Sequence, residues 1–365
     1  MAVLMIGPKA IGWGDMCKKL YSTLTMVTFR DRFLTIEAAL TRLANKASKE
    51  GATKSGKNLT EKAPLAGLNT ASNLDINVAS NTGINAIYFG LVLSGYEFAC
   101  INKPASAITL INQIQNYTGL AGARRYFGYT RQQSCEVYPF WPRAALLESA
   151  VFFMSAGHCM QFDYDQYCDY VMTRANITSD ERNEDFFRWV RDFPKHLEII
   201  KSDAFFQEAD SKMDAMVSKL SATTSADNEK ILAMLETLTT DVETGISNIS
   251  VDICPLKCVY SADYFVRDTK MTVILGDFLP HSIVHEYLHL IVGPQVLMYK
   301  EKILAQFGNR LFDIDQSYYM NNDEHGFINA FEEHIVRKIS NCILDEMEIS
   351  VEQIIIDELA KSTNI

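Results

Sequence analysis

The stretch that decides the fold is residues 271–289, which read MTVILGDFLPHSIVHEYLH. Its first five residues are mostly apolar or β-branched, a pattern typical of a buried strand. Pro280 ends this strand region, and Ser282 is expected to cap a helix that continues through His289. The stretch therefore predicts a strand followed closely by an amphipathic helix.

Another β-type run lies just upstream of this strand. Residues 264–266 read Tyr-Phe-Val, and the polar residues 267–270 separate them from the strand at 271–275. Two apolar runs joined by a short polar segment predict a β-hairpin. We therefore expect a small sheet before the helix.

Much of the remaining chain has helical periodicity. Apolar residues recur at three- and four-residue steps over residues 139–160, 179–219 and 228–242, and Pro194 is expected to interrupt the second of these segments. Together with the hairpin, this pattern predicts an α+β fold that is mainly helical.

A polar stretch divides the chain. Residues 44–83 are rich in Lys, Ser, Thr, Asn and Gly and show little periodicity, which favours a linker or mobile loop. We therefore expect an N-terminal region with a polar linker over residues 1–83. A second unit should cover residues 84–365, with a helical middle at 139–245 and a core at 251–345.

The composition disfavours several classes of protein. The chain has 365 residues, 48% of them hydrophobic and 22% charged, as in ordinary globular proteins. A formal net charge of −11 disfavours a nucleic-acid partner. The longest apolar stretch, residues 84–100, contains too many polar residues to span a bilayer. Eight scattered cysteines and no visible secretory signal favour a cytoplasmic location, with Cys254 and Cys258 as buried thiols.

The predicted helix carries a His-Glu-x-x-His motif formed by His285, Glu286 and His289. Residues four apart on a helix lie about 5–6 Å from each other, so the two imidazoles can share one metal ion. Glu286 lies about 100° around the helix from His285, where a carboxylate can act on a metal-bound water without being a ligand. His281 is expected to be solvent-exposed at the helix start rather than a further ligand.

A catalytic zinc site usually has three protein ligands, so another donor is expected downstream. Residues 324–344 have helical periodicity and predict a second helix that crosses the first. Both Glu332 and Glu333 lie on this helix. Glu332 shares its face with apolar residues and Glu333 shares its face with polar ones, and helical position alone leaves the choice open.

Residues 285–289 (HEYLH), followed by Gly293-Pro294, and residues 333–337 (EHIVR) resemble the zincin metallopeptidases whose third ligand is a glutamate. Within them, the pattern is similar to largely uncharacterised bacterial zincin-like proteins with a Glu-x-x-Val-Arg signature. The resemblance favours Glu333 as the third ligand of a Zn²⁺ ion. It also implies a zincin-like catalytic unit, a peptide or protein substrate, and a cleft bordered by the strand at 271–275. Arg337 departs from the thermolysin-like pattern, which has an acidic residue there.

The resemblance implies an active zinc metallopeptidase in which Glu286 serves as the general base. The alternative is a zincin-like fold that is catalytically inactive and serves in binding or structure. An active enzyme would need a donor for the developing oxyanion. The candidates that lie near the motif in sequence are Tyr318, Tyr319, His325, His334 and Arg337.

Overall fold

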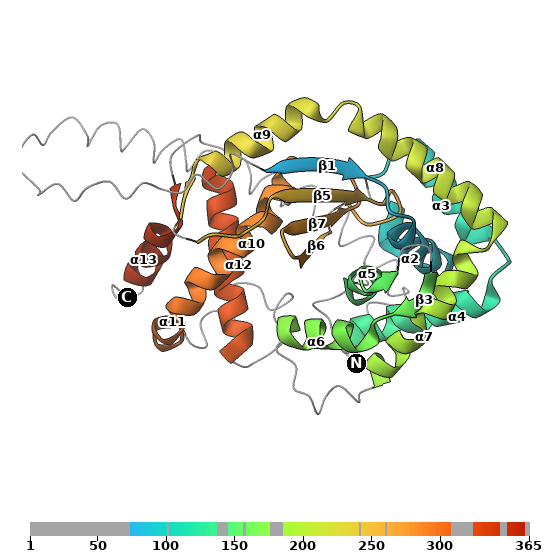
Figure 1. The fold of residues 1–365 in the computed structure, drawn as a ribbon, viewed down its shortest axis with the longest axis horizontal. Helices are drawn as coiled ribbons and strands as arrows, with labels where there is room; N and C mark the ends of the chain where they lie inside the picture. The colour runs from blue at the N-terminus through green and yellow to red at the C-terminus, as the bar shows by residue number, and fades with distance from the viewer. Residues whose placement is uncertain are drawn as a thin grey trace, which may run out of the picture. The chain divides into compact units, whose positions relative to one another are not determined.

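The computed structural model describes residues 74–100, 102–136, 145–155, 158–175, 185–240, 242–259, 261–307, 324–343 and 349–361. All of them belong to the compact unit Ala66–Ile365. The predicted N-terminal region therefore lies outside the described residues, apart from its last ten positions. The described part is mainly helical with a small mixed sheet, as expected for the α+β class (Figure 1).

The central sheet has the strand order β1 (Asp75–Ala79), β5 (Asn248–Ile253), β7 (Lys270–Leu275) and β6 (Ala262–Arg267). The first three strands are parallel, and β6 pairs with β7 in antiparallel orientation. β7 is thus paired on both sides. Among the residues that the structure describes, β1 and β6 are the two edge strands of this sheet.

The predicted hairpin is confirmed as β6 and β7. Arg267 pairs with Lys270, which leaves Asp268 and Thr269 as a two-residue turn. Asp268 has a φ of 56°, a left-handed conformation that aspartate tolerates better than most residues. The turn fixes the register of the two strands.

The last ten residues of the predicted linker are part of the fold, so the linker prediction was wrong at this end. Ile76 and Val78 alternate with more exposed residues in β1, which pairs with β5. Asn81 caps helix α2 (Thr82–Leu93): its Oδ1 accepts from the Gly83 and Ile84 amides at 3.0 and 3.3 Å. This polar stretch forms a strand because it pairs with β5, which lies far along the chain, and Asn81 then begins the helix.

Helices fill most of the chain between β1 and β5. They are α2, a 3-10 helix η1 (Glu97–Cys100), α3 (Ala105–Asn116), α4 (Ala121–Glu136), α5 (Ala145–Val151), α6 (Tyr164–Ala175), α7 (Asp185–Lys201), α8 (Ala204–Ser221) and α9 (Ser225–Glu236). Two-residue strands β2 (Met154–Ser155) and β4 (Leu238–Thr239) and strand β3 (His158–Phe162) complete this part.

Two helix predictions in this part were wrong. The segment 139–160 is not one helix, because α5 ends at Val151 and β2 and β3 pair antiparallel after it. Pro194 does not interrupt α7, whose neighbouring Phe193 and Leu197 stay buried in the core and hold the helix together. The break comes instead at Asp203, whose side chain caps α8.

The helix predicted after the hairpin is α10 (Pro280–Met298), and the predicted second helix is α12 (Glu324–Ile343). The two pack against each other (Figure 1). Ser282 is not the cap of α10, because the helix begins two residues earlier with Pro280 at its first position. Three further elements lie in this C-terminal part: α11 (Lys300–Phe307), β8 (Ile349–Ser350) and α13 (Val351–Lys361).

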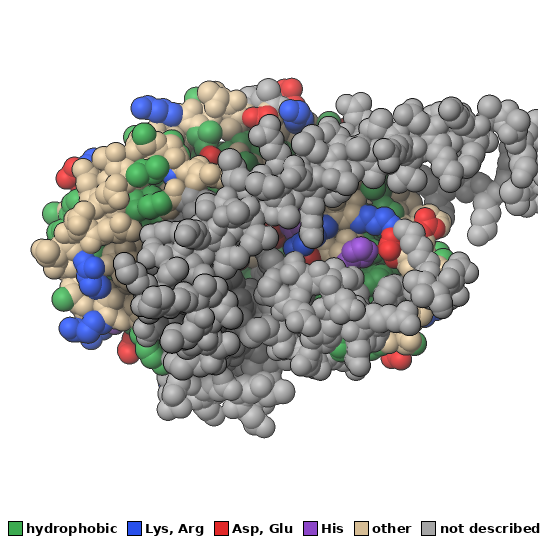
Figure 2. Space-filling model, turned by 180° about the vertical axis from the view of Figure 1, so that it is seen from behind, with side chains coloured by type: hydrophobic (Ala, Val, Ile, Leu, Met, Phe, Trp, Pro, Cys, Tyr) green, Lys and Arg blue, Asp and Glu red, His purple; other side chains and the backbone are tan. Residues whose placement is uncertain are grey.

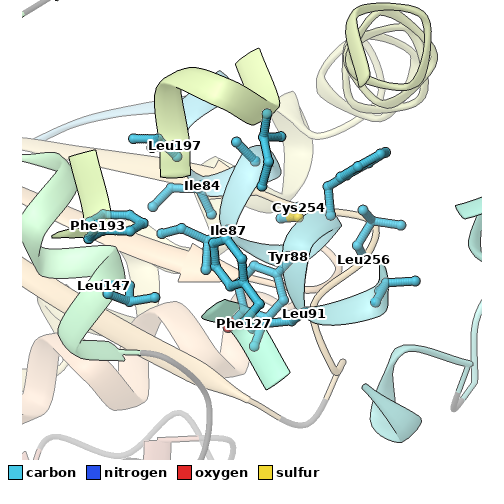
Figure 3. Close-up of a cluster of buried hydrophobic side chains, with 14 of the residues drawn as sticks. Ile84, Ile87, Tyr88, Leu91, Phe127, Leu147, Phe193, Leu197, Cys254 and Leu256 are labelled. Atoms are coloured by element: carbon cyan, nitrogen blue, oxygen red, sulfur yellow. The ribbon is translucent and has the colours of Figure 1, made fainter. Parts of the chain in front are cut away.

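The sheet lies between two hydrophobic clusters. Met271, Val273 and Leu275 of β7 belong to the cluster that includes α10 and α12, whereas Ile274 belongs to the cluster built around α2. Figure 3 shows the second cluster, in which α2 packs against side chains from several other helices and from the segment after β5. Cys254 and Cys258 are buried free thiols, as expected. No helix of the described ranges combines the length and apolar character needed to cross a membrane.

Candidate metal centre

Helix α10 presents both motif histidines on one side. The ring centroids of His285 and His289 are 5.2 Å apart, and the ring planes make an angle of 77°. Their side chains are 25% and 17% exposed. Figure 2 shows a histidine side chain at the surface of the described part, close to acidic and basic side chains. The exposed fractions of His285 and His289 place both side chains at the edge of the core.

Helix α12 brings Glu333 to the two histidines. Its Oε2 atom lies 3.6 Å from Nε2 of His285 and 3.4 Å from Nε2 of His289. One ligand atom from each residue lies within 4.8 Å of the others, so the three could hold a metal ion. Bonds of about 2.0–2.1 Å at tetrahedral angles would place such atoms about 3.3 Å apart. The two distances from Glu333 to the histidines are close to this value.

Glu332 contacts the opposite nitrogen of the same ring. Its Oε1 atom lies 2.7 Å from Nδ1 of His289. Histidines that bind metal ions are commonly oriented by a carboxylate at their second nitrogen. Of the two glutamates that sequence left open, Glu333 thus lies at the potential ligand position, and Glu332 lies behind His289. The prediction could not anticipate that both adjacent carboxylates would contact one imidazole.

The close approach of α10 and α12 depends on Gly293, one turn after His289. A Cβ atom added at Gly293 would lie 3.2 Å from Oε1 of Glu332 and 3.3 Å from its Cδ. A side chain at this position would therefore press on the carboxylate that contacts His289. The glycine leaves room for Glu332 between the helices.

Arg337, one turn after Glu333, contacts the other oxygen of that carboxylate. Its Nε donates to Oε1 of Glu333 at 2.5 Å. Burial would raise the pKa of Glu333, but its hydrogen bonds to His285 and His289 and the charge of Arg337 outweigh burial and lower that pKa well below its usual range. Glu333 is therefore an anion with one oxygen directed to the histidines.

Glu286 is buried beside the metal ligands. Burial raises the pKa of its carboxyl group, the two histidines act in the opposite direction, and the charges of Asp263 and Glu333 add to the increase. Burial would lower the pKa of His289, but its hydrogen bonds to Glu332 and Glu333 raise it to about 10. Such strongly perturbed groups are typical of functional sites.

Strand β6 contacts α10 and is an edge strand of the sheet. The resemblance implied a cleft bordered by the strand at 271–275, but β7 is an interior strand of the sheet. Tyr264 of β6 lies with its ring 6.0 Å from the His289 ring and nearly parallel to it, at 15°. Sequence reasoning missed Tyr264, although its position in the hairpin next to the motif helix was a signal.

The remaining predicted site residues are less directly involved. His281 is exposed and does not belong to the metal-binding group, as expected. Nε2 of His334 lies 3.5 Å from Oε2 of Glu358 in α13. Tyr318 and Tyr319 lie outside the described residues, as does the side chain of His325.

Neither the protein-family models nor the curated proteins nor the solved structures contain a match to this chain. The resemblance to zincins therefore stays a prediction that rests on the motif residues. The packing of α10 and α12, which brings Glu333 to the two histidines, is an observation independent of that resemblance.

Proposed function

We propose that this protein is a zinc-dependent hydrolase and, as its specific activity, a peptidase. The observation that carries the proposal is the convergence of His285, His289 and Glu333 from two helices, next to the buried Glu286. Two imidazoles and one carboxylate with an open fourth position are a donor set typical of catalytic zinc.

The chemistry would be divided among these residues. A zinc ion bound there would supply Lewis acidity toward a carbonyl group and lower the pKa of water. Glu286 takes the proton from the attacking water and passes it to the leaving amine, a role for which a buried carboxyl group of raised pKa is suited. Glu332 keeps the His289 ring in place through Nδ1. Arg337 holds Glu333 with one oxygen toward the histidines.

The geometry of β6 supports an extended peptide as the substrate. In a hairpin closed by a two-residue turn, the residue pair that flanks the turn is hydrogen-bonded. Hydrogen-bonded and non-hydrogen-bonded pairs then alternate along the two strands. The backbone groups of Ala262, Tyr264 and Val266 therefore point away from β7. An extended chain could pair with this edge through Ala262 and Val266, which flank Tyr264 and its contact with His289.

The test has two steps. Purified protein should retain about one equivalent of zinc, and a content below about half an equivalent under non-chelating conditions would count against the proposal. The zinc-loaded protein should then cleave members of a mixed peptide library, detected by mass spectrometry.

Two variants separate the metal from the chemistry. Glu286→Gln should keep the zinc and lose hydrolysis, whereas Glu333→Gln should lose the zinc itself. Zinc retention without cleavage of any peptide would refute the peptidase activity and favour a zincin-like binding protein. Equal hydrolysis by wild type and Glu286→Gln would refute the assigned base.

A further inference from the structure

A buried cluster of charged and polar side chains lies on the other side of β6 from the metal centre. Lys257, in the segment between β5 and β6, has a fully buried side chain. Its Nζ donates to the Tyr88 hydroxyl at 2.9 Å, to Oε1 of Glu148 at 2.8 Å and to Oδ2 of Asp263 at 2.5 Å. These three bonds use all three protons of the ammonium group.

The lysine stays charged in this position. Burial would lower the pKa of Lys257, but the interactions with Asp263 and Glu148 outweigh burial and hold it above its usual range. Tyr88 also donates to Oε1 of Glu148, at 2.7 Å. The cluster is therefore a connected network with a cation at its centre.

Such a network contributes little to net stability. Removing two charges from water costs several kcal/mol for each ion, which the attraction between them only roughly offsets. Apolar replacements of buried ion pairs are often neutral or stabilising. Hydrogen bonds from a fully buried ammonium group do, however, fix the positions of their partners.

The four members of the network come from different parts of the chain. Tyr88 lies on α2, Glu148 on α5, and Lys257 in the segment after β5, whereas Asp263 lies on β6. Among the described residues, the sheet supports β6 only through β7. The network therefore connects the edge strand β6 to helices of the α2 cluster, where Figure 3 shows the place of Tyr88.

Asp263, through which the network holds β6, is next in sequence to Tyr264, which faces the candidate metal centre. Side chains alternate along a strand, so Asp263 and Phe265 point to one face of β6 and Tyr264 to the other. Phe265 is indeed buried in the α2 cluster, and Tyr264 lies against His289. Fixing Asp263 thus fixes the backbone of Tyr264.

We propose that Lys257 is a positioning residue: through Asp263 it holds β6 in place beside the candidate metal centre, so that the outward backbone groups of Ala262 and Val266 receive an extended peptide in register. The inference rests on the proposed peptidase function for the peptide and on the observed network for the strand. Lys257 itself touches neither ligand nor metal.

Amide hydrogen exchange of the full-length protein tests the position of the strand. The double variant Lys257→Met/Glu148→Gln removes the connection, and only Asp263, whose side chain is 25% exposed, loses its cation. The amides of Asp263 and Phe265, which face β7, should exchange about tenfold faster, as expected for the loss of a charge-assisted hydrogen bond. Amides of α10 and α12 should not change. Lys212→Met, which breaks an exposed pair with Glu208, is the matched control.

Unchanged exchange in β6 would overturn the proposal, and so would an equal increase in α10 and α12, which would show a merely structural role. If the double variant does not fold, Asp263→Ala serves for the same comparison, because it leaves Lys257 paired with Glu148.

Ligand affinity provides a second readout. Acetohydroxamate can bind only at the metal, whereas a tripeptide hydroxamate also requires the strand. The variant should bind acetohydroxamate like wild type and lose about tenfold in affinity for the tripeptide hydroxamate. An unchanged ratio of the two affinities would overturn the positioning role. If wild type binds neither compound, the proposed function fails, and the exchange measurement still decides the inference about β6.

Discussion

Replacing Gly293 with alanine adds one methyl group where α10 passes α12. The new Cβ atom would lie 3.2 Å from Oε1 and 3.3 Å from Oε2 of Glu332, closer than most real contacts. The carboxylate must then move by a few tenths of an ångström. Because Oε1 also contacts Nδ1 of His289 at 2.7 Å, that hydrogen bond should lengthen.

Two effects of opposite sign follow. Alanine is favoured over glycine by about 1 kcal/mol inside a helix. A charge-assisted hydrogen bond is worth about 1.5–3 kcal/mol, of which the shift removes a part. The free energy of unfolding of the metal-free protein should therefore change by less than about 1 kcal/mol. A carboxylate that orients a metal-bound histidine is worth about 10–100-fold in metal affinity, so its partial displacement should weaken zinc binding about three- to tenfold.

The assay is competition with a zinc-chelating indicator, combined with urea unfolding of the metal-free protein. Gly128→Ala is the matched control, because its Cβ would meet only Ser94 at an ordinary 3.9 Å within α4. The control should gain about 1 kcal/mol in stability and bind zinc like wild type. If Gly293→Ala behaves like this control in both measurements, the argument that Gly293 leaves room for the Glu332–His289 contact is wrong.

Three further predictions concern other residues. Glu333→Gln should abolish stoichiometric zinc binding, whereas Glu332→Gln should keep the stoichiometry and lower the affinity about 10–100-fold, both measured by the same competition assay. Burial raises the pKa of Glu148 from 4.5 to about 8, so the free energy of unfolding should fall as pH rises across this window. In Glu148→Gln, the free energy of unfolding from urea titrations should depend less steeply on pH. Asn81→Ala should lower the free energy of unfolding by about 2 kcal/mol, since it removes a helix cap and a 2.8 Å hydrogen bond to the buried Asp252.

The sequence predicted the local features of the metal centre. The hairpin, the helix at α10 and the second helix at α12 follow from periodicity and turn residues, and these signals lie within short windows of the chain. Spacing alone placed His285, Glu286 and His289 on one helix. Local patterns of this kind can be seen without knowledge of the rest of the fold.

Features that depend on distant partners could not be predicted. β1 lies in a polar segment, and its strand character depends on pairing with β5, about 170 residues later. The Lys257 network joins α2, α5 and β6 in the same way. Pro194 was misjudged because packing of α7 outweighs the backbone bond that proline removes. In each case the decisive contact joins residues that are far apart in the sequence, so a short stretch of sequence does not reveal it.

The two adjacent glutamates would make a divalent cation the favoured ion at the proposed metal site. His289 lies between them, with Glu332 at Nδ1 and Glu333 near Nε2. With neutral histidines, the formal charges are three carboxylates, including Glu286, and one guanidinium from Arg337, which leaves a net charge of −2 in a partly buried site. Uncompensated charge of this size is unfavourable away from water. A proton on His289 offsets one charge, consistent with its raised pKa, and a divalent cation offsets both. The same electrostatics that hold the proton in the metal-free protein therefore favour its replacement by a metal ion.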